Sequence, residues 1–226
     1  MQVPTSAPRD SDDLESRAAR IAGLSLGELA HLANIAIPGN FKRQKGWTGQ
    51  LIELWLGATA GSKPTQDFPE LGIELKTLPI DANGMPLETT YVCYAPLVPA
   101  PMMNWQRSNV RNKLQCVLWV PVEGQRDILV AQRRIATPFI WQPSEQQDQQ
   151  LQRDWELLTE MIALGQVESI TARHGDFMQL RPKAASGKVL ADALGPEGQR
   201  IKTRPRGFYL RKEFTQGILQ QHFGCY

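Results

Sequence analysis

Gln66-Asp-Phe-Pro-Glu-Leu-Gly-Ile-Glu-Leu-Lys-Thr77 combines an expected β-strand with three charged groups in the pattern D-x6-E-x-K. Residues 71–78 alternate in polarity, so Glu74 and Lys76 are expected to point together to one face of the strand. Asp67 and Glu74 offer the hard carboxylate oxygens that Mg²⁺ prefers, and Lys76 can polarise a water or steady a charged phosphate. The pattern therefore indicates a centre that cleaves phosphodiester bonds.

A second interpretation of the same stretch is a half-buried strand whose outer face carries a solvated Glu74–Lys76 pair, which is common on protein surfaces. Glu74-Leu-Lys76 is the only acid-x-Lys sequence in the chain, and it lies on the segment that alternates best as a strand. That position favours the nuclease hypothesis but leaves the solvated pair open.

The composition limits the class of protein. The chain has 226 residues, 42% of them hydrophobic, which is enough to bury the core of one domain or of two intimate lobes. Cys93, Cys116 and Cys225 are far apart and show neither zinc nor disulfide spacing, which fits a reducing compartment. No apolar run approaches the roughly 18 residues of a membrane span, so a soluble, cytoplasmic protein without a membrane partner is expected.

The net charge is only +2, but the basic residues concentrate toward the C-terminus. Residues 165–226 contain ten Lys and Arg against five Asp and Glu, whereas residues 1–164 contain fifteen against eighteen. The clusters that could neutralise DNA phosphates are Lys42-Arg43-Gln44-Lys45, Arg181-Pro-Lys183, Arg204-Pro-Arg206 and Arg211-Lys212. Each cluster by itself is better explained as a solvated loop.

The expected secondary structure is of the α/β class. Helices are predicted over residues 10–22, from the capping box that starts at Ser25 to Asn34, and over residues 46–60. A strand over residues 89–94 follows the motif strand after the turn sequence Asp81-Ala-Asn83-Gly84, so the two strands are expected to form a hairpin.

The second half of the chain continues the alternation. A short helix over residues 108–114, strands over 117–122 and 128–131, and a long helix capped by Ser144 with Gln147 are predicted. Strands over residues 177–180 and 208–210 then alternate with helices near 188–194 and 214–222.

Ordered segments along nearly the whole chain resemble the MutH family of bacterial DNA mismatch-repair endonucleases. The matching segments are Lys45-Gly-Trp47, Glu53-Leu-Trp-Leu-Gly57, Gly61-Ser-Lys-Pro64, Gln66-Asp-Phe68, Glu74-Leu-Lys-Thr77, Pro86-Leu-Glu-Thr-Thr90, Val120-Pro-Val-Glu-Gly124, Leu164-Gly-Gln-Val167, Thr171-Ala-Arg-His-Gly175, Arg181-Pro-Lys183 and Pro205-Arg-Gly-Phe-Tyr-Leu210. So many matches in order are far more specific than the D-x6-E-x-K pattern.

The resemblance implies a restriction-endonuclease-like α/β fold, with a mixed β-sheet flanked by helices. Residues 14–226 would form a single nuclease domain of two closely joined lobes that make a DNA cleft, and residues 1–13 would be a flexible N-terminus. The implied activity is Mg²⁺-dependent nicking of the unmethylated strand at hemimethylated GATC sites in double-stranded DNA, with one or two ions. The implied partner is the mismatch-repair ATPase MutL, and MutS indirectly; a monomer is expected.

By the same resemblance, Asp67, Glu74 and Glu53 are metal ligands, and Lys76 positions or activates the attacking water. Lys113 corresponds to a further basic residue near the catalytic centre, with Glu88 as its partner. For Lys113 and Glu88, a surface role stays open.

Glu53 has small neighbours, Gly49 and Gly57, which are expected to let its helix approach the motif strand. The alternative for Glu53 is a solvent-facing residue on an amphipathic helix.

DNA-binding roles are carried over to residues from several segments. The resemblance assigns DNA approach from one lobe to Lys45 and Gly46, base reading to Arg181 and Pro182 beside Lys183, and methyl sensing to Tyr209. Arg can pair with guanine through two hydrogen bonds in the major groove, where the methyl group of N6-methyladenine also lies. Tyr91 stands where the family commonly has Phe. Without the resemblance, Tyr209 would be better explained as a core residue.

Two other classes remain open at this point. One is a restriction-type enzyme that cuts both strands at GATC sites. The other is a non-catalytic DNA-binding module on the same scaffold.

Overall fold

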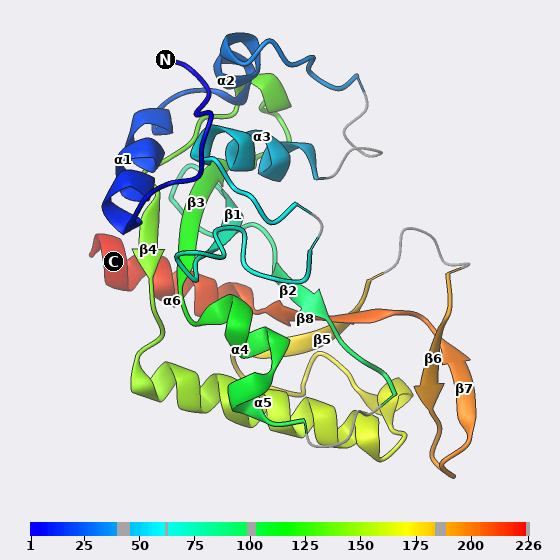
Figure 1. Ribbon diagram of the computed structural model, residues 1–226. Helices are drawn as coiled ribbons and strands as arrows, with labels where there is room; N and C mark the ends of the chain where they lie inside the picture. The colour runs from blue at the N-terminus through cyan, green and yellow to red at the C-terminus, as the bar shows by residue number, and fades with distance from the viewer. Residues whose placement is uncertain (40–45, 62, 99–102, 184–188, 225–226) are drawn as a thin grey trace. The chain divides into compact units, whose positions relative to one another are not determined.

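The structure is a computed structural model that describes residues 1–39, 46–61, 63–98, 103–183 and 189–224. The chain divides into two compact units (Figure 1): Met1–Glu88 with Gln115–Gln142, and Thr89–Leu114 with Pro143–Tyr226. The strands of the described residues form three small sheets, one in the first unit and two in the second. The prediction of an α/β protein is confirmed, and one of the sheets combines parallel with antiparallel pairing.

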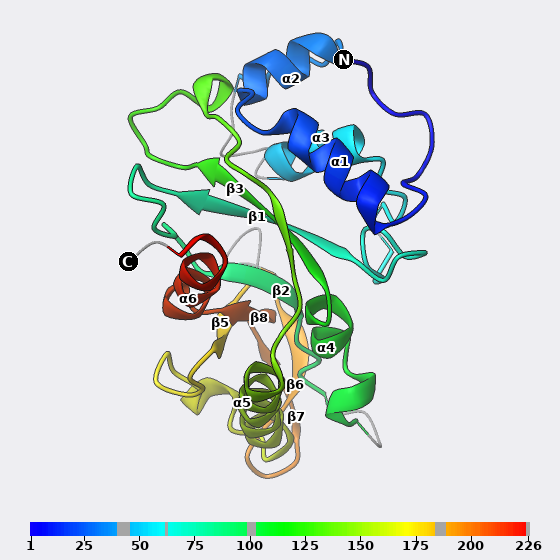
Figure 2. The ribbon, with the colours of Figure 1, turned by 90° about the vertical axis from the view of Figure 1, so that its left-hand side faces the viewer.

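The first unit is a sheet covered by helices. Its elements are α1 (Ser11–Ile21), α2 (Leu26–Leu32), α3 (Trp47–Leu56), β1 (Glu74–Ile80), β3 (Val117–Glu123), the 3-10 helix η2 (Val130–Gln132) and β4 (Phe139–Trp141). The central strand β3 pairs in parallel with β1 and antiparallel with β4. α3 packs against β1, and α1 packs against α3 and β4 (Figures 1 and 2). Nearly all side chains of the central strand β3 are buried, as is usual for a parallel strand.

The helices of the first unit begin and end at local signals. The Asp10 side chain accepts a hydrogen bond from the backbone of Asp13 at the start of α1, and Ser25 forms a capping box with Glu28 at the start of α2. α3 ends at Gly57, which has the left-handed conformation (φ +78°) that favours glycine. These helix predictions are confirmed.

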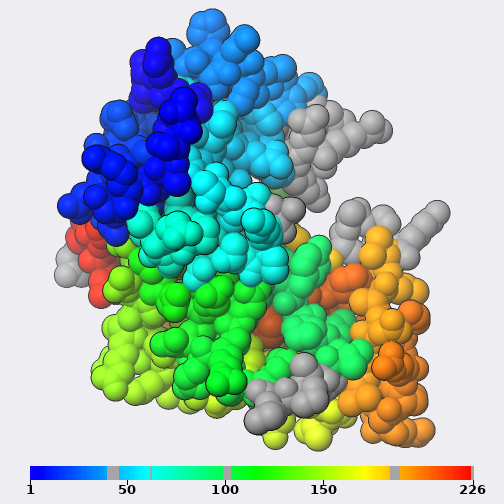
Figure 3. Space-filling model, in the orientation of Figure 1, coloured from blue at the N-terminus to red at the C-terminus, as the bar shows by residue number. Residues whose placement is uncertain are grey.

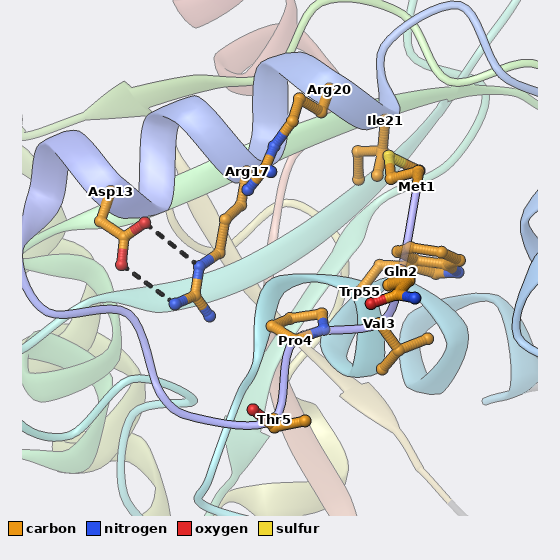
Figure 4. Close-up of a pocket in the computed structure, with 10 residues that line it drawn as sticks. All are labelled: Met1, Gln2, Val3, Pro4, Thr5, Asp13, Arg17, Arg20, Ile21 and Trp55. Atoms are coloured by element: carbon orange, nitrogen blue, oxygen red, sulfur yellow. Dashed lines mark hydrogen bonds and ion pairs between the residues drawn. The ribbon is translucent and has the colours of Figure 1, made fainter.

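The N-terminal segment lies against the helices of the first unit. Arg17 is 8% exposed and donates hydrogen bonds to the carbonyl oxygens of Ser6, Ala7 and Leu56, and it also pairs with Asp13. A cavity of about 310 Å³ (Figure 4) is lined by residues 1–5, Asp13, Arg17, Arg20, Ile21 and Trp55. In the space-filling view (Figure 3) this segment is the dark blue surface of the first unit. None of the D-x6-E-x-K residues lines the cavity, and the flexibility predicted for residues 1–13 stays a prediction.

The second unit contains an antiparallel sheet and a separate hairpin. Its elements are β2 (Thr90–Tyr94), the 3-10 helix η1 (Trp105–Arg107), α4 (Asn109–Leu114), α5 (Glu145–Ala163), the 3-10 helix η3 (Val167–Ser169), β5 (Met178–Pro182), β6 (Ala191–Leu194), β7 (Arg200–Thr203), β8 (Arg206–Leu210) and α6 (Lys212–Phe223). β8 is the central strand of the sheet β2-β8-β5, and β6 pairs with β7.

One face of the β2-β8-β5 sheet is a hydrophobic core. Its buried side chains are Val92, Met178, Leu180, Phe208 and Leu210, each at most 3% exposed. The predicted helix α5 packs against β5 and β6, and Figure 2 views this helix almost along its axis. Its apolar stripe of Leu151, Trp155, Leu158 and Ile162 is buried, as predicted.

The entry to β5 is fixed by a buried carboxylate on α5. Asp154 is 2% exposed and accepts hydrogen bonds from the backbone N–H groups of Asp176, Phe177 and Met178 at 3.0, 2.6 and 2.8 Å. The amide of Gln150 donates a further bond at 2.9 Å. Asp154 therefore anchors the strand that leads to Arg181.

The predicted hairpin between the motif strand and residues 89–94 is wrong. The turn forms, since Asp81 Oδ1 accepts hydrogen bonds from the backbone of Asn83 and Met85, but only one bridge, between Ile80 and Pro86, follows it. β1 and β2 then belong to different sheets and different units. A turn sequence specifies local chain reversal, whereas the strand partner is chosen by distant apolar residues.

Two further element predictions are wrong. Residues 128–131 were expected to form a strand, but the 3-10 helix η2 occupies part of this range. The end of β3 is instead paired through a single antiparallel bridge between Val122 and Ile135. The helix expected near residues 188–194 is replaced over 191–194 by strand β6, because its pairing with β7 overrides a weak local helix preference. The short strand β4 was not predicted, since three residues are too few to show a period.

None of the helices in the described ranges has the length and apolar character needed to cross a bilayer.

Candidate functional site

Asp67 and Glu74 meet across a tight turn in the first unit. Phe68 and Ile73 bond to each other through both backbone N–H groups, at 2.9 and 3.2 Å, and residues 69–72 form the loop between them. Gly72 closes this loop with φ +66°, in the left-handed region. Asp67 and Glu74 are the residues that flank this bridge on either side, and extending the antiparallel pairing by one residue would place them opposite each other on one face. The six-residue spacing in the sequence is therefore the spacing of this turn.

Backbone hydrogen bonds hold both acidic residues in place. The N–H of Leu75 donates to Asp67 Oδ2 at 2.8 Å, and the N–H of Thr59 donates to the carbonyl oxygen of Asp67 at 3.1 Å. The N–H of Glu74 donates to the carbonyl oxygen of Cys116 at 3.0 Å, which ties the start of β1 to the residue that precedes β3. The Asp67 carboxylate and the Glu74 backbone are therefore attached to a fixed framework.

Lys76 and Glu74 form a buried ion pair. Lys76 Nζ lies 2.6 Å from Glu74 Oε1, and the two side chains are 12% and 3% exposed. The interpretation as a solvated surface pair is therefore wrong, because β1 is covered on both faces at this end. Burying two charges costs solvation energy that hydrophobic residues would not lose. Such a pair in a strand is better explained by chemistry than by stability.

Glu53 is half-buried on α3, the helix that packs against β1. A Cβ at Gly49 would lie 3.8 Å from Glu53 Oε1, so the carboxylate lies beside this glycine. Gly57 has a different reason to be small: it ends the helix in the left-handed conformation, and a Cβ there would lie 2.6 Å from Arg17 Nη1. Gly57 was expected to let its helix approach the motif strand. In the structure, its missing Cβ instead leaves room for Arg17 and the N-terminal segment.

The donor chemistry of the turn fits a hard divalent cation. Asp67 and Glu74 contribute carboxylate oxygens, the ligands that Mg²⁺ takes in proteins. Within the ranges that the structure describes, no three His, Cys, Asp or Glu side chains are gathered as a metal cluster. Glu53 as the third ligand of such an ion therefore stays a prediction.

The predicted DNA-binding residues of three distant segments gather on one sheet face of the second unit. The central strand β8 pairs Tyr209 with Tyr91 on β2 and with Gln179 on β5. It also pairs Gly207 with Arg181. Directly paired residues share a face, so Tyr91, Tyr209 and Arg181 lie together on the side opposite the hydrophobic core.

Aromatic and cationic side chains contact one another on this face. The rings of Tyr91 and Tyr209 meet edge to face with centroids 5.3 Å apart. Lys183 Nζ lies 4.1 Å from the Tyr91 centroid, and Arg181 Cζ lies 5.7 Å from that of Tyr209, both within cation–π range. Tyr209 is half-buried, so the interpretation as a core tyrosine is wrong.

Gly207 makes room for the Tyr91 ring. A Cβ at Gly207 would lie 2.7 Å from Tyr91 Cε2 and 3.1 Å from the carbonyl oxygen of Cys93. Burial raises the pKa of Tyr91 well above that of a free tyrosine, with a smaller contribution from Cys93. The phenol therefore keeps its proton and stays a hydrogen-bond donor at physiological pH.

The other described residues that were predicted to act in catalysis or DNA binding lie in different segments of the two units. Lys113 is half-buried on α4 of the second unit, whereas Glu88 is the exposed last residue of a segment of the first. Gly46 is exposed at the start of α3, Pro182 is exposed at the end of β5, and Lys45 lies outside the described residues. The parts of Lys113 and Glu88 in catalysis stay predictions.

Sequence reasoning missed Asp154 and Tyr94. Asp154 sits in a polar helix, where nothing in the sequence separates a buried carboxylate from a solvated one. Tyr94 follows Tyr91 by three residues, a spacing that in a regular strand would place the two side chains on opposite faces.

Comparison with known proteins places this arrangement in context. The family model described as "DNA mismatch repair enzyme MutH" matches residues 56–154. The chain is similar to the DNA mismatch repair protein MutH of Escherichia coli (strain SE11), with 56% identity over 218 residues, which cover 96% of this chain and 95% of that protein. The DNA mismatch repair protein MutH of Shigella dysenteriae serotype 1 (strain Sd197) matches with the same identity, 56%, and the same coverage.

Proposed function

Since the chain belongs to the MutH family of DNA mismatch repair enzymes, we propose that it nicks the unmethylated strand at hemimethylated GATC sites in double-stranded DNA. It is a DNA mismatch repair endonuclease of the restriction-endonuclease-like class and uses a divalent metal. The observation that carries the proposal is the turn closed by the Phe68–Ile73 bridge, which brings the Asp67 carboxylate to the backbone of Leu75, with Lys76 2.6 Å from Glu74 Oε1.

The metal is proposed to be Mg²⁺, as one or two ions, bound by Asp67 and Glu74 with Glu53 as a further ligand. When bound, Mg²⁺ would supply a Lewis acid for the scissile phosphate and a more acidic water. Asp67 stays oriented through its hydrogen bond from Leu75. Lys76 offsets the charge of Glu74, and its role is to position or activate the attacking water and to steady the charge that develops on the phosphate during attack. Because both charges are buried, their effect on the reacting phosphate is little screened by water.

Strand and site selection are assigned to the second unit. The adenine N6 edge and the guanine O6 and N7 acceptors lie in the major groove. Arg181 can bind guanine through two hydrogen bonds, and Tyr209 offers an aromatic surface that a methyl group would displace. The contact of Tyr209 with Tyr91 and Arg181 supports a rigid reader, since each side chain limits the others. DNA approach from Lys45 and Gly46 is part of the same proposal.

The proposed setting is cytoplasmic methyl-directed repair. The protein would act as a monomer activated by MutL, which responds to MutS. Lys113 would assist the catalytic centre, with Glu88 as its partner.

A supercoiled plasmid assay tests the function. The plasmid carries GATC in unmethylated, hemimethylated or fully methylated form and is incubated with Mg²⁺, with and without MutL. We expect nicked circles from the hemimethylated plasmid, more of them with MutL, and none from the fully methylated plasmid or in EDTA. Linear product, or equal cutting of fully methylated DNA, would indicate a restriction-type enzyme. Binding without nicking, even with MutL, would indicate a non-catalytic module.

Arg181 and Lys183 are expected to contribute to binding in different ways. Arg181→Ala should weaken binding to a GATC duplex about 10- to 100-fold and binding to a scrambled duplex far less, because a base contact is lost. Lys183→Gln should weaken binding to both duplexes equally. It should also make the fall of log affinity with log salt less steep, by the amount expected for the loss of about one phosphate contact. Fluorescence anisotropy titrations at several salt concentrations measure both quantities. Equal losses on the two duplexes for Arg181→Ala would contradict its role as a base reader.

A further inference from the structure

Tyr94 is the most exposed aromatic side chain in the part of the chain that the structure describes, at 61%. It ends β2, which is an edge strand of the sheet β2-β8-β5. Large aromatic side chains contribute strongly to binding interfaces because they offer wide contact at low entropic cost. An aromatic residue this exposed is therefore a candidate contact for a binding partner.

An irregularity of the strand aims Tyr94 at the proposed DNA-binding face. The register pairs Tyr91 with Tyr209, then Cys93 with Phe208 and Tyr94 with Gly207, so one extra residue of β2 is accommodated between Tyr91 and Cys93. Such a β-bulge shifts the alternation of side chains by one position. Tyr94 is thereby returned to the face that carries Tyr91.

Tyr94 lies in the same row as Arg181. Both are paired with Gly207, one from each side, so the row across the three strands is Tyr94, Gly207 and Arg181. The Tyr94 ring meets the Tyr91 ring edge-on, with centroids 5.8 Å apart and planes at 75°. One edge of Tyr94 is thus fixed by protein, while most of its surface faces solvent.

The neighbouring charges indicate the chemistry of the partner. The Lys183 ammonium lies over the Tyr91 ring and the Arg181 guanidinium over the Tyr209 ring, so the face is cationic and fits a polyanion. Tyrosine hydroxyls donate hydrogen bonds to DNA phosphates, and such contacts set the position of a protein on the duplex. A residue at the sheet edge, in the same row as the proposed base reader, is placed for such a contact.

We propose that Tyr94 is a DNA-positioning residue whose hydroxyl donates a hydrogen bond to a backbone phosphate beside the recognition site. The proposal rests on the proposed function, since it takes the face of Tyr91, Arg181 and Tyr209 as the DNA-binding surface. Tyr94 contributes affinity without reading sequence, because phosphates carry no base information.

The test compares Tyr94→Phe and Tyr94→Ala with Leu157→Ala, a matched exposed position on α5 (40% exposed). Anisotropy titrations use a labelled hemimethylated GATC duplex and a scrambled duplex in EDTA, where no cutting occurs. Tyr94→Phe should weaken both duplexes about 10- to 100-fold, the loss of one charge-assisted hydrogen bond. The salt slope should stay unchanged, because the phenol carries no charge. Leu157→Ala should bind like the unchanged protein.

Three outcomes would overturn the proposal. If Tyr94→Phe binds both duplexes normally, the hydroxyl has no phosphate partner, even when Tyr94→Ala is weak through loss of ring packing on Tyr91. A loss confined to the GATC duplex would make Tyr94 a base reader, and a loss equal to that of Leu157→Ala would remove any specific role. Thermal unfolding of each variant identifies a folding defect. A failed proposed function looks different: the unchanged protein then shows no metal-dependent nicking, whatever the Tyr94 variants do.

Discussion

Nicking by Asp67→Ala is expected to fall on the order of 10³-fold, because the variant loses a metal ligand and with it several kcal/mol of stabilisation of the transition state. Asp67 also accepts a hydrogen bond from the backbone of Leu75, so removal of its side chain could loosen the turn as well. Single-turnover nicking of a hemimethylated duplex in Mg²⁺ measures the loss.

Asp67→Asn separates the two effects. The amide oxygen can still accept the hydrogen bond from Leu75, but the carboxylate charge is gone. We expect Asp67→Asn to be as inactive as Asp67→Ala, with an unchanged melting temperature and DNA affinity in EDTA. If Asp67→Asn kept more than about a tenth of the activity, Asp67 would be a structural residue of the turn, not a metal ligand.

Asp154→Ala is expected to lower the free energy of unfolding of the second unit by about 4 kcal/mol. The substitution removes the acceptor of three backbone N–H groups at the start of β5: that of Met178 is buried, and those of Asp176 and Phe177 make part-buried hydrogen bonds. A buried N–H without an acceptor costs about 1 to 3 kcal/mol, and the two part-buried groups cost less. Urea unfolding followed by linear extrapolation measures the change. Because the same hydrogen bonds fix the strand that carries Arg181, binding to a GATC duplex should weaken too.

Two control substitutions on the same helix define this effect. Asp154→Asn keeps one acceptor oxygen and should cost about half as much. Glu156→Ala removes an exposed carboxylate, bonded at 2.7 Å only to Gln152 among the hydrogen bonds described, and should change stability by less than about 0.5 kcal/mol. Equal effects of Asp154→Ala and Glu156→Ala would contradict the anchoring role.

Local signals in the sequence predicted local structure well. Asp10 and Ser25 mark the starts of α1 and α2 because a cap depends on residues within one helical turn. The alternation around Glu74 predicts β1, but not that its partner is the parallel strand β3, forty-three positions away at Val117. Strand pairing depends on which distant apolar surfaces meet, and the Asp81 turn favoured the wrong partner.

In the candidate functional site, too, the features made by adjacent residues could be predicted, whereas those made by distant segments could not. The turn between Asp67 and Glu74 is formed by adjacent residues, so it is implicit in the spacing of the two acids. The gathering of Tyr91, Arg181 and Tyr209 depends on the order β2-β8-β5, which joins segments over a hundred residues apart. Their roles came from family resemblance alone. The bulge that turns Tyr94 toward them cannot be recognised from the composition or the alternation of the strand sequence.

Strand-resolved cleavage is the most direct test of the account. A duplex with a single hemimethylated GATC site carries a different fluorophore on each strand and is incubated with the unchanged protein or Asp67→Asn in Mg²⁺, with MutL present in both reactions. We predict cutting of the unmethylated strand only, at GATC, by the unchanged protein and not by Asp67→Asn. Cutting of both strands, or equal cutting by Asp67→Asn, would contradict the assignment of strand choice and of the cutting centre.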